Sequence, residues 1–318
     1  MASLMPVAVA SRSFSVNRTL RDELAERHPG SKFNDTDRVL AGDELALFLR
    51  GYRMAITGLD VLTDAIFRAV PELRVVSKYG VGLDTIDLDA ARRHGVSVRW
   101  TPGVNRQAVA ELTIAFMLTL CRSVVPQARA LSEGKWTQVR GRQLSSAAVG
   151  VVGCGAIGQS VARLCRAFGA TVLAHDIRVY EEFYRDAGVT PVDFDTLLSQ
   201  ADIVTIHLPL DPTTEGLIDA RALRRMKASS FLVNTARGPI VDEAALAAAL
   251  VEGRLAGAAA DVFTVEPPAG SPLVGLTNFV GTPHIGGATF EAGLAMGRAA
   301  IDGLEGGGSS INLTTLDD

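Results

Sequence analysis

The sequence predicts an α/β protein of two domains, each a doubly wound parallel sheet with helices on both faces. The chain has 318 residues, more than the ~250–300 at which a single hydrophobic core usually stops growing. Short apolar runs alternate with helical stretches, and this alternation starts twice, near residue 7 and again near residue 149. Such alternation is typical of parallel strands joined by crossover helices. One long helical stretch, residues 105–122, lies between the two starts.

The first half of the chain carries four expected strands. They are residues 7–10, 54–57, 75–77 and 96–98, and the expected helices between them are 19–27, 63–70 and 87–94. Each of these helical stretches is followed by glycine or proline, which end helices. A turn at residues 101–103 then precedes the helix 105–122, where apolar residues recur every four positions. We interpret this helix as the passage from one domain to the other.

The second half repeats the pattern with six expected strands. They are residues 149–152, 171–174, 203–206, 231–233, 258–260 and 279–281. A helix is expected after the first of these strands and another at residues 289–304. The glycine-rich stretch 306–310 is predicted to be flexible.

The composition excludes several classes of protein. Apolar residues make up 47% and charged residues 21%, so a buried core is expected. A formal net charge of -4 provides no basic surface for nucleic acid. No run approaches the ~18 apolar residues of a membrane span, and the N-terminus lacks a signal-peptide pattern. Three irregularly spaced cysteines predict no disulfide framework and no metal site, and they favour a cytoplasmic location.

A glycine loop follows the strand at 149–152 and reads Gly153-Cys154-Gly155-Ala156-Ile157-Gly158. The pattern G-x-G-x-x-G is weak alone, but here a strand precedes it and a helix follows it. Gly153 permits the tight turn, Gly155 lets the backbone approach a pyrophosphate, and Gly158 lets the helix pack on the sheet. The helix N-terminus offers N–H groups to the phosphates. The loop predicts a Rossmann dinucleotide site; the alternative is a glycine-rich turn without a ligand.

An acidic residue, Asp176, ends the next expected strand, 23 residues after Gly153. A carboxylate at this position accepts hydrogen bonds from a ribose 2′-OH and repels a 2′-phosphate. NAD is therefore predicted in preference to NADP. Arg178, two residues further on, could weaken that preference.

Hydride transfer at a carbinol needs an acid–base group, and histidine suits this role near neutral pH. The chain has five histidines, and His28 lies in a charged run that reads as surface. His207 and His284 each follow an expected strand, where ligands bind in doubly wound sheets. Gly286 and Gly287 allow a cofactor to approach closely, which favours His284; the alternative is a structural turn histidine.

Charged residues follow two other expected strands. Arg237 comes after residues 231–233, and the forked guanidinium suits a carboxylate. Asp261 and Glu266 come after residues 258–260. Glu266 could orient His284 and favour its imidazolium form, whereas Asp261 could bond the nicotinamide carboxamide or merely cap the loop. Structural roles, an ion pair for Arg237 and a cap for Glu266, are the alternatives.

These segments together resemble the D-isomer-specific 2-hydroxyacid dehydrogenase family, and within it the D-3-phosphoglycerate dehydrogenase branch. The resemblance covers nearly the whole chain. Besides the glycine loop it rests on Lys78-Tyr79-Gly80-Val81-Gly82-Leu83-Asp84, Val109-Ala110-Glu111-Leu112, His207-Leu208-Pro209-Leu210, Asn234-Thr235-Ala236-Arg237-Gly238, Asp261-Val262-Phe263 with Glu266-Pro267, and Thr282-Pro283-His284.

The resemblance implies a role for each candidate residue. His284 matches the acid–base histidine, Glu266 its partner, and Arg237 the residue that binds the substrate carboxylate and carbonyl. Asp176 matches the ribose-binding acid, and the amides of Ala156 and Ile157 match contacts to the pyrophosphate. Further cofactor contacts are implied at His207, Leu208, Pro209, Thr235, Ala236, Asp261, Gly286 and Gly287. Substrate contacts are implied at Lys78 and at the backbone amides of Val81 and Gly82.

The resemblance also implies how the chain is divided. A Rossmann NAD-binding domain, residues 104–285, is expected to be inserted in a flavodoxin-like substrate domain. That substrate domain is formed by residues 1–103 and by 286–318, where the chain returns to it. A homodimer that uses residues 122–144 is implied as well, with a small 2-oxoacid or 2-hydroxyacid as ligand.

The substrate stays open, because the chain departs from the phosphoglycerate dehydrogenases. They usually carry a basic pair after the second strand of the substrate domain, and residues 56–61 contain no basic residue. The regulatory domain of that branch is also expected to be absent. The expected activity is NAD-dependent reduction of a 2-oxoacid to a D-2-hydroxyacid. Alternatives are an NAD-sensing protein similar to transcriptional corepressors, and oxidation of an unusual donor such as phosphite.

Overall fold

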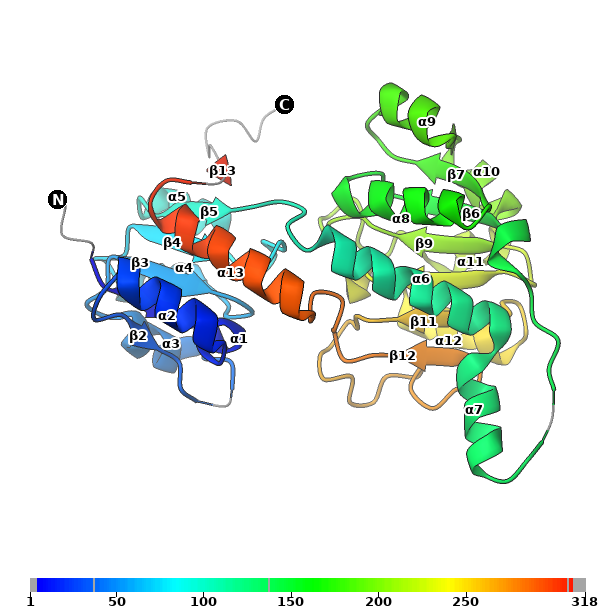
Figure 1. Cartoon of the computed structure of the whole chain (residues 1–318), viewed down its shortest axis with the longest axis horizontal. Coiled ribbons are helices and arrows are strands. Elements are labelled where there is room, and N and C mark those ends of the chain that lie inside the picture. The colour runs from blue at the N-terminus through cyan, green and yellow to red at the C-terminus, as the bar shows by residue number, and fades with distance from the viewer. Residues whose placement is uncertain (1–4, 37, 137, 308, 311–318) are drawn as a thin grey trace. The chain divides into compact units, whose positions relative to one another are not determined.

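A computed structural model describes residues 5–36, 38–136, 138–307 and 309–310 of the chain. The chain forms two compact units, which we call the first unit (residues 1–105 and 287–318) and the second unit (residues 106–286) (Figure 1). The divisions follow residues 105 and 286, whereas the sequence placed them after residues 103 and 285.

The first unit has one sheet, and its described strands follow the order β13-β5-β4-β3-β1-β2. Five of them pair in parallel: β1 (Val7–Val9), β2 (Lys32–Phe33), β3 (Met54–Thr57), β4 (Val75–Lys78) and β5 (Ser97–Trp100). Their order, 2-1-3-4-5, is that of flavodoxin-like folds. The backbone of β13 (Ser309–Ser310) pairs antiparallel with β5, where the sequence had predicted a flexible tail.

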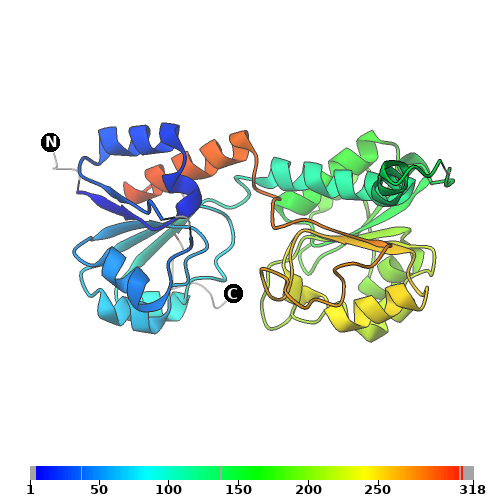
Figure 2. The same cartoon turned by 90° about the horizontal axis from the view of Figure 1, so that it is seen from below.

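Helices cover both faces of this sheet (Figure 2). One face carries α1 (Arg12–Ser15), α2 (Arg18–Arg27) and α13 (Phe290–Leu304), and the other carries α3 (Gly42–Leu49), α4 (Asp64–Ala69) and α5 (Leu88–Arg93). Side chains alternate along a strand, so Val7 and Val9 face the first group whereas Ala8 faces the second. Gly297 brings α13 close to α2, because a Cβ there would overlap the Leu20 side chain.

The second unit has a larger sheet whose described strands are all parallel, in the order β12-β11-β10-β9-β6-β7-β8. The strands are β6 (Ala148–Val152), β7 (Thr171–His175), β8 (Thr190–Pro191), β9 (Ile203–Ile206), β10 (Phe231–Asn234), β11 (Gly257–Ala260) and β12 (Phe279–Gly281). Counted from β6, this is the Rossmann order 3-2-1-4-5-6 with one more strand after the sixth.

The helices of the second unit also lie on both faces of their sheet. α6 (Arg106–Arg122), α8 (Ala156–Ala167) and α9 (Glu181–Ala187) contribute to one core, together with the 3₁₀ turn η1 (Leu144–Ser146). α10 (Phe194–Gln200), α11 (Ala220–Arg225), α12 (Glu243–Val251) and the 3₁₀ turn η2 (Gly238–Ile240) contribute to the other. The remaining helix, α7 (Val124–Ser132), contains no buried residue.

The predicted fold class is confirmed, and every strand expected from the sequence is present. The strands that were not predicted are β2, β8 and β13, each of two residues. Among the described residues no single helix is long and apolar enough to span a membrane; α6 and α7 together have that length and composition, but they are bent by 64°.

Candidate active site

The glycine loop links β6 to α8 in the second unit, and its glycines differ in what surrounds them. Gly153 has a φ of +92°, and a Cβ there would lie 2.7 Å from the carbonyl oxygen of His207. A Cβ on Gly158 would overlap the carbonyl oxygen of Gly153. Around the Cβ position of Gly155, by contrast, no atom of the described residues other than its chain neighbours lies within 4 Å. Packing therefore requires two of the glycines, whereas Gly155 leaves an open approach to the backbone.

The N-terminus of α8 opens onto this approach. Gly155 is the N-cap residue, and no side chain caps the first turn. The backbone N–H groups of a helix's first turn lack partners within the helix, so they attract anions. The predicted pyrophosphate contacts, Ala156 and Ile157, are the first two residues of this turn.

Asp176 follows β7 and is fixed against the glycine loop. One carboxylate oxygen accepts a hydrogen bond from the backbone N–H of Cys154 (2.6 Å), and the other accepts one from that of Arg178 (2.8 Å). Carboxylate oxygens have further lone pairs, which can accept hydrogen bonds from ribose hydroxyls. No pattern in the sequence indicated that Asp176 would also support the loop itself.

His207 follows β9 and is unsuited to acid–base work. Its Nε2 lies 2.9 Å from the Thr205 hydroxyl, and its buried Nδ1 has no hydrogen-bond partner among the described residues. Burial lowers the pKa of His207 to about 3, so the ring is neutral at physiological pH. Next to it, Leu208 packs against the core, and the carbonyl of Pro209 accepts a hydrogen bond from Thr214 (2.7 Å).

His284 follows β12 and pairs with Glu266, as the sequence predicted. Its Nδ1 lies 2.8 Å from one carboxylate oxygen of Glu266, and the other oxygen accepts the backbone N–H of Phe263 (3.0 Å). The hydrogen bond to Glu266 raises the pKa of His284, although burial and the charge of Arg237 oppose it. Burial raises the pKa of Glu266, but the bonds from His284 and Phe263 outweigh it and lower the pKa overall. The pair therefore favours the imidazolium–carboxylate state.

Asp261, at the end of β11, holds the backbone around His284. Its buried carboxylate accepts hydrogen bonds from the Thr282 hydroxyl (2.5 Å) and from the backbone N–H groups of Ile285 and Gly286 (both 2.7 Å). Its own carbonyl accepts the N–H of His284 (2.9 Å). Of the two roles considered from the sequence, these bonds support the loop cap; the nicotinamide contact stays a prediction.

Arg237 lies beyond β10, in a turn that Asn234 closes. The Asn234 side chain donates to the carbonyl of Arg237 (2.9 Å) and accepts from the N–H of Ala236 (3.0 Å). Nη1 of Arg237 donates to the carbonyl of Ala236 (2.7 Å), and its charge lowers the pKa of both Glu266 and His284. The hydroxyl of Thr235, which precedes this pair, lies 2.9 Å from that of Thr113 in α6.

Three charged groups thus gather beyond the carboxyl ends of the neighbouring strands β10, β11 and β12, in a unit that also carries a dinucleotide loop. Residues 114–286 match the family model described as D-isomer specific 2-hydroxyacid dehydrogenase, NAD binding domain. The chain belongs to this family.

Relatives in the family carry several names. A D-3-phosphoglycerate dehydrogenase from Archaeoglobus fulgidus is 40% identical over 269 residues, which are 83% of this chain and 51% of the relative. The chain therefore spans about half the length of that protein. A glyoxylate reductase from Thermofilum pendens is 41% identical over 80% of this chain and 79% of the relative. A D-lactate dehydrogenase structure from Aquifex aeolicus, complexed with NAD and lactic acid, is 26% identical with a TM-score of 0.83 over 93% of each chain.

The second unit fits the NAD of this dehydrogenase family. Gly155 leaves the backbone accessible, the first turn of α8 is uncapped, and Asp176 is fixed beside both. These are the features that hold a pyrophosphate and a ribose in Rossmann domains. The cofactor is therefore NAD, held by the second unit.

The predicted substrate contacts of the family, Lys78, Val81 and Gly82, lie in the first unit, as does Gly287. In the part of the chain that the structure describes, the backbone N–H groups of Val81 and Gly82 have no acceptor, so they can bind an anion. The Lys78 ammonium is buried and donates to the carbonyl of Gly58 (2.5 Å) and to the Thr85 hydroxyl (2.6 Å). Direct contact of Lys78 with substrate stays a prediction.

Several contacts were missed or misread in the sequence, two of them at candidate site residues. Trp100 donates its indole N–H to the carbonyl of Val81 (2.8 Å), and Glu243 binds the segment that carries Glu266. His28, predicted at the surface, is 1% exposed, and its Nδ1 lies 2.9 Å from the carbonyl of Met5. No local pattern could have found these contacts, because each joins residues more than 15 positions apart.

Proposed function

We propose that this protein is an NAD-dependent dehydrogenase that interconverts a 2-oxoacid and a D-2-hydroxyacid. The observation that carries the proposal is the 2.8 Å contact between His284 and Glu266, with the charge of Arg237 close to both. An imidazolium next to a guanidinium can protonate a carbonyl oxygen while the carboxylate of the same molecule is held. The names of the relatives, among them a glyoxylate reductase and a D-lactate dehydrogenase, agree with this class of substrate.

Each side chain has a separate part in the proposed reaction. Bound NADH supplies the hydride that reduces C2 of the oxoacid. Arg237 holds the substrate carboxylate. Since Nδ1 of His284 is bound to Glu266, Nε2 is the nitrogen that gives its proton to the carbonyl oxygen. In the reverse direction neutral His284 takes the hydroxyl proton.

We propose further that the substrate lacks a phosphate group. At the end of β3, Thr57 and Asp60 are buried, and Val61 is an exposed apolar residue. Asp60 accepts a hydrogen bond from the backbone N–H of Gly58 (2.9 Å). This segment therefore carries an acidic residue where the phosphoglycerate dehydrogenases usually carry basic residues. The nearby Lys78 charge offsets part of the charge of Asp60, but a carboxylate offers no attraction to a phosphate. Glyoxylate, pyruvate and hydroxypyruvate are therefore better candidates than 3-phosphohydroxypyruvate.

A substrate screen tests the proposed function. NADH consumption is measured with the four oxoacids above, with NADPH in parallel, for the wild type, His284→Ala and the control His94→Gln. His94 lies in the first unit and bonds Asp64, so its variant should keep wild-type turnover. His284→Ala should lose roughly 10²–10⁴ in kcat. Full activity of His284→Ala would refute its role, and an oxoacid-inactive wild type that reduces NAD with phosphite would refute the substrate class.

NADH should support faster turnover than NADPH, because Asp176 repels the extra phosphate.

We also propose that the protein is a cytoplasmic homodimer. Its three cysteines, Cys121, Cys154 and Cys165, are buried free thiols, which suits a reducing compartment. The dimer is supported by apolar side chains that α7 leaves exposed. Fractionation of cells that express the tagged protein checks the location.

A further inference from the structure

Glu266 stands on a segment without helix or strand. Residues 261–273, which follow β11, run as an irregular loop. Within this loop, Glu266 is bound to the backbone of Phe263. Hydrogen bonds between catalytic side chains demand accurate placement, and a displacement of about 1 Å can cost 10²-fold in rate. The accuracy of the His284–Glu266 contact therefore depends on what holds this loop in place.

One carboxylate binds the loop on both sides of Glu266. Glu243 is the first residue of α12, and one of its oxygens accepts the backbone N–H of Thr264 (2.6 Å). The other oxygen accepts the hydroxyl of Ser271 (2.6 Å). Thr264 comes two residues before Glu266 and Ser271 five residues after it. Glu243 thus ties both flanks of the Glu266 segment to the rigid start of a helix.

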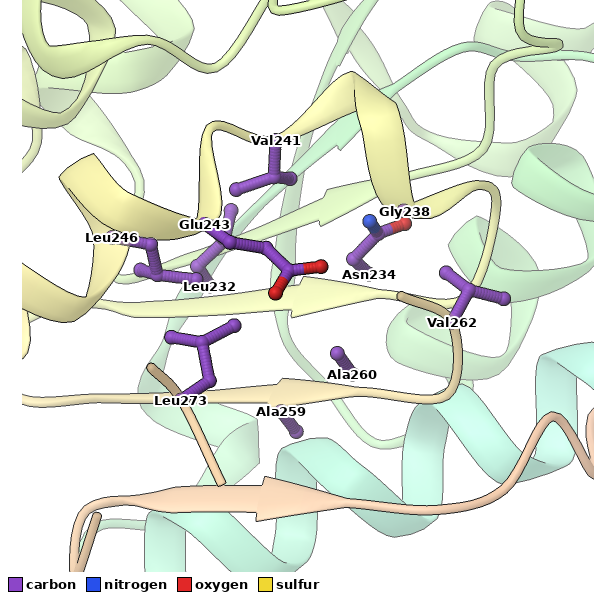
Figure 3. Close-up of a pocket in the computed structure, with 10 residues that line it drawn as sticks. All are labelled: Leu232, Asn234, Gly238, Val241, Glu243, Leu246, Ala259, Ala260, Val262 and Leu273. Carbon is purple, nitrogen blue, oxygen red and sulfur yellow. The ribbon is translucent and has the colours of Figure 1, made fainter. Parts of the chain in front are cut away.

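A small pocket and a glycine lie beside this attachment. Figure 3 shows its carboxylate projecting from the start of α12 into a small pocket. Besides Glu243, the pocket is lined by the polar Asn234 and by apolar residues, namely Leu232, Gly238, Val241, Leu246, Ala259, Ala260, Val262 and Leu273. The bond to Thr264 is exposed and that to Ser271 is partly buried, and a charged acceptor makes both stronger than bonds between neutral groups. Gly238 supports the same loop, because a Cβ there would overlap the backbone of Phe263.

We infer that Glu243 is a positioning residue for the catalytic pair, because its carboxylate fixes the segment that carries Glu266 against His284. It touches neither of these side chains itself and acts through Thr264 and Ser271. The inference rests on the proposed function, in which His284 needs Glu266 to stay protonated. Glu266 supplies the negative charge that acts on His284, and Glu243 determines the position of that charge.

Four variants test the inference. Glu243→Ala removes both bonds, and Ser271→Ala removes one. Glu243→Gln keeps both, because its amide oxygen can accept the Thr264 N–H and its amide N–H can donate to the Ser271 oxygen. Glu252→Ala is the matched control, since Glu252 lies at the other end of α12 and pairs with Arg254. For each protein we would measure kcat, the pH profile of kcat/KM for the best oxoacid, and the dissociation constant of NADH.

Glu243→Ala should lose about 10–100-fold in kcat, with NADH affinity unchanged, because the glycine loop is untouched. The alkaline limb of its kcat/KM profile should move to lower pH. Among the charged groups that face His284, Glu266 and Asp261 favour the imidazolium, whereas Arg237 opposes it. When Glu266 is displaced, its stabilisation of the imidazolium is weakened. Ser271→Ala should show a smaller change in the same direction, and Glu243→Gln and Glu252→Ala should resemble the wild type.

The inference is overturned if Glu243→Ala keeps the wild-type pH profile, or if Glu243→Gln is as impaired as Glu243→Ala. Should Glu243→Ala fail to unfold cooperatively, Ser271→Ala decides: a wild-type kcat and pH profile would overturn the inference. An NMR titration of the His284 ring provides a readout that needs no turnover. It distinguishes this inference from the proposed function, because the titration of His284 should shift in Glu243→Ala or Ser271→Ala even if no oxoacid is reduced.

Discussion

Two carboxylates hold His284, and they act on different parts of the residue. Glu266 bonds the ring, whereas Asp261 bonds the backbone through the N–H groups of Ile285 and Gly286. His284 has a φ of +54°, a left-handed conformation that residues other than glycine adopt only where their surroundings hold them. Asp261 supplies that hold. It therefore sets where the imidazole stands, and Glu266 sets the charge that the imidazole carries.

Replacing Glu266 by glutamine should change the pH dependence of the reaction. The bond to Glu266 raises the pKa of His284, so the imidazolium that reduces an oxoacid persists to higher pH and is lost as the pH rises through that pKa. Without the negative charge the pKa falls. In Glu266→Gln, oxoacid reduction should therefore decline from a lower pH than in the wild type, and kcat near neutrality should drop by about 10²-fold.

The measurement is the pH profile of kcat/KM in both directions. Oxidation of the hydroxyacid, which needs neutral His284, should extend to lower pH in the variant. Glu252→Gln, at the exposed end of α12, is the control and should match the wild type. An unchanged alkaline limb for reduction by Glu266→Gln would show that Glu266 does not set the charge of His284.

At the scale of elements, β6, the glycine loop and α8 follow one another along the chain, and each glycine of the loop has a different role. Gly158 lets α8 pack over the loop, and Gly153 lets the end of β9 approach it, since a Cβ on either would meet backbone atoms. Gly155 has open space where a Cβ would stand, so packing does not require a glycine there. The reason for Gly155 is then the ligand.

This difference predicts opposite outcomes for two alanine variants. Gly155→Ala should unfold at the wild-type denaturant midpoint and bind NADH on the order of tenfold more weakly, because its methyl group enters the approach to the backbone. Gly158→Ala should lose about 1–3 kcal/mol of unfolding free energy, because its methyl group overlaps the carbonyl of Gly153. Urea unfolding and NADH fluorescence titration check both. Wild-type NADH affinity in Gly155→Ala would contradict a pyrophosphate at this loop.

How much of these elements the sequence could predict depended on the length of each apolar run. β6 and β9 are continuous apolar runs bounded by turn residues, and both were predicted with bounds within one residue. β2 and β8, with the sequences Lys32–Phe33 and Thr190–Pro191, are too short to show any periodicity. The same limit applies to the site. His284 and Arg237 follow predictable strands, whereas Glu243 acts through partners 21 and 28 residues away, which no spacing rule reveals.

At the scale of the whole molecule, the chain builds the first unit from both its ends. α13 packs beside α2, where Arg298 bonds Glu23 (2.7 Å) and Arg27 bonds Glu305 (2.6 Å). These exposed pairs contribute little energy each, and the apolar contacts of Ala300 and Ile301 supply most of the attachment. Periodicity alone shows that residues 289–304 form a helix. It could not show which sheet the helix covers, because that choice depends on contacts across more than 250 residues.

The last prediction concerns how two copies of the molecule associate. α7 contains no buried residue, although Val124, Val125 and Leu131 are apolar and 49%, 47% and 57% exposed. Beyond it, Trp136 is 82% exposed. Exposed apolar side chains that gather on one element are unfavourable in water and are typical of interfaces between proteins. A second copy that offers the same surface could cover it, as happens in twofold dimers.

Leu131→Asp should therefore convert a dimer into a monomer, because an interface would have to bury two unpaired carboxylates, one from each copy. Sedimentation equilibrium across a range of protein concentrations measures the change. Val251→Asp places the same charge on another exposed valine, at the end of α12, and should remain dimeric. A wild type that sediments as a monomer, or a Leu131→Asp variant as dimeric as the control, would exclude α7 as the interface. Since the proposed catalytic side chains belong to other elements, the monomer should still bind NADH.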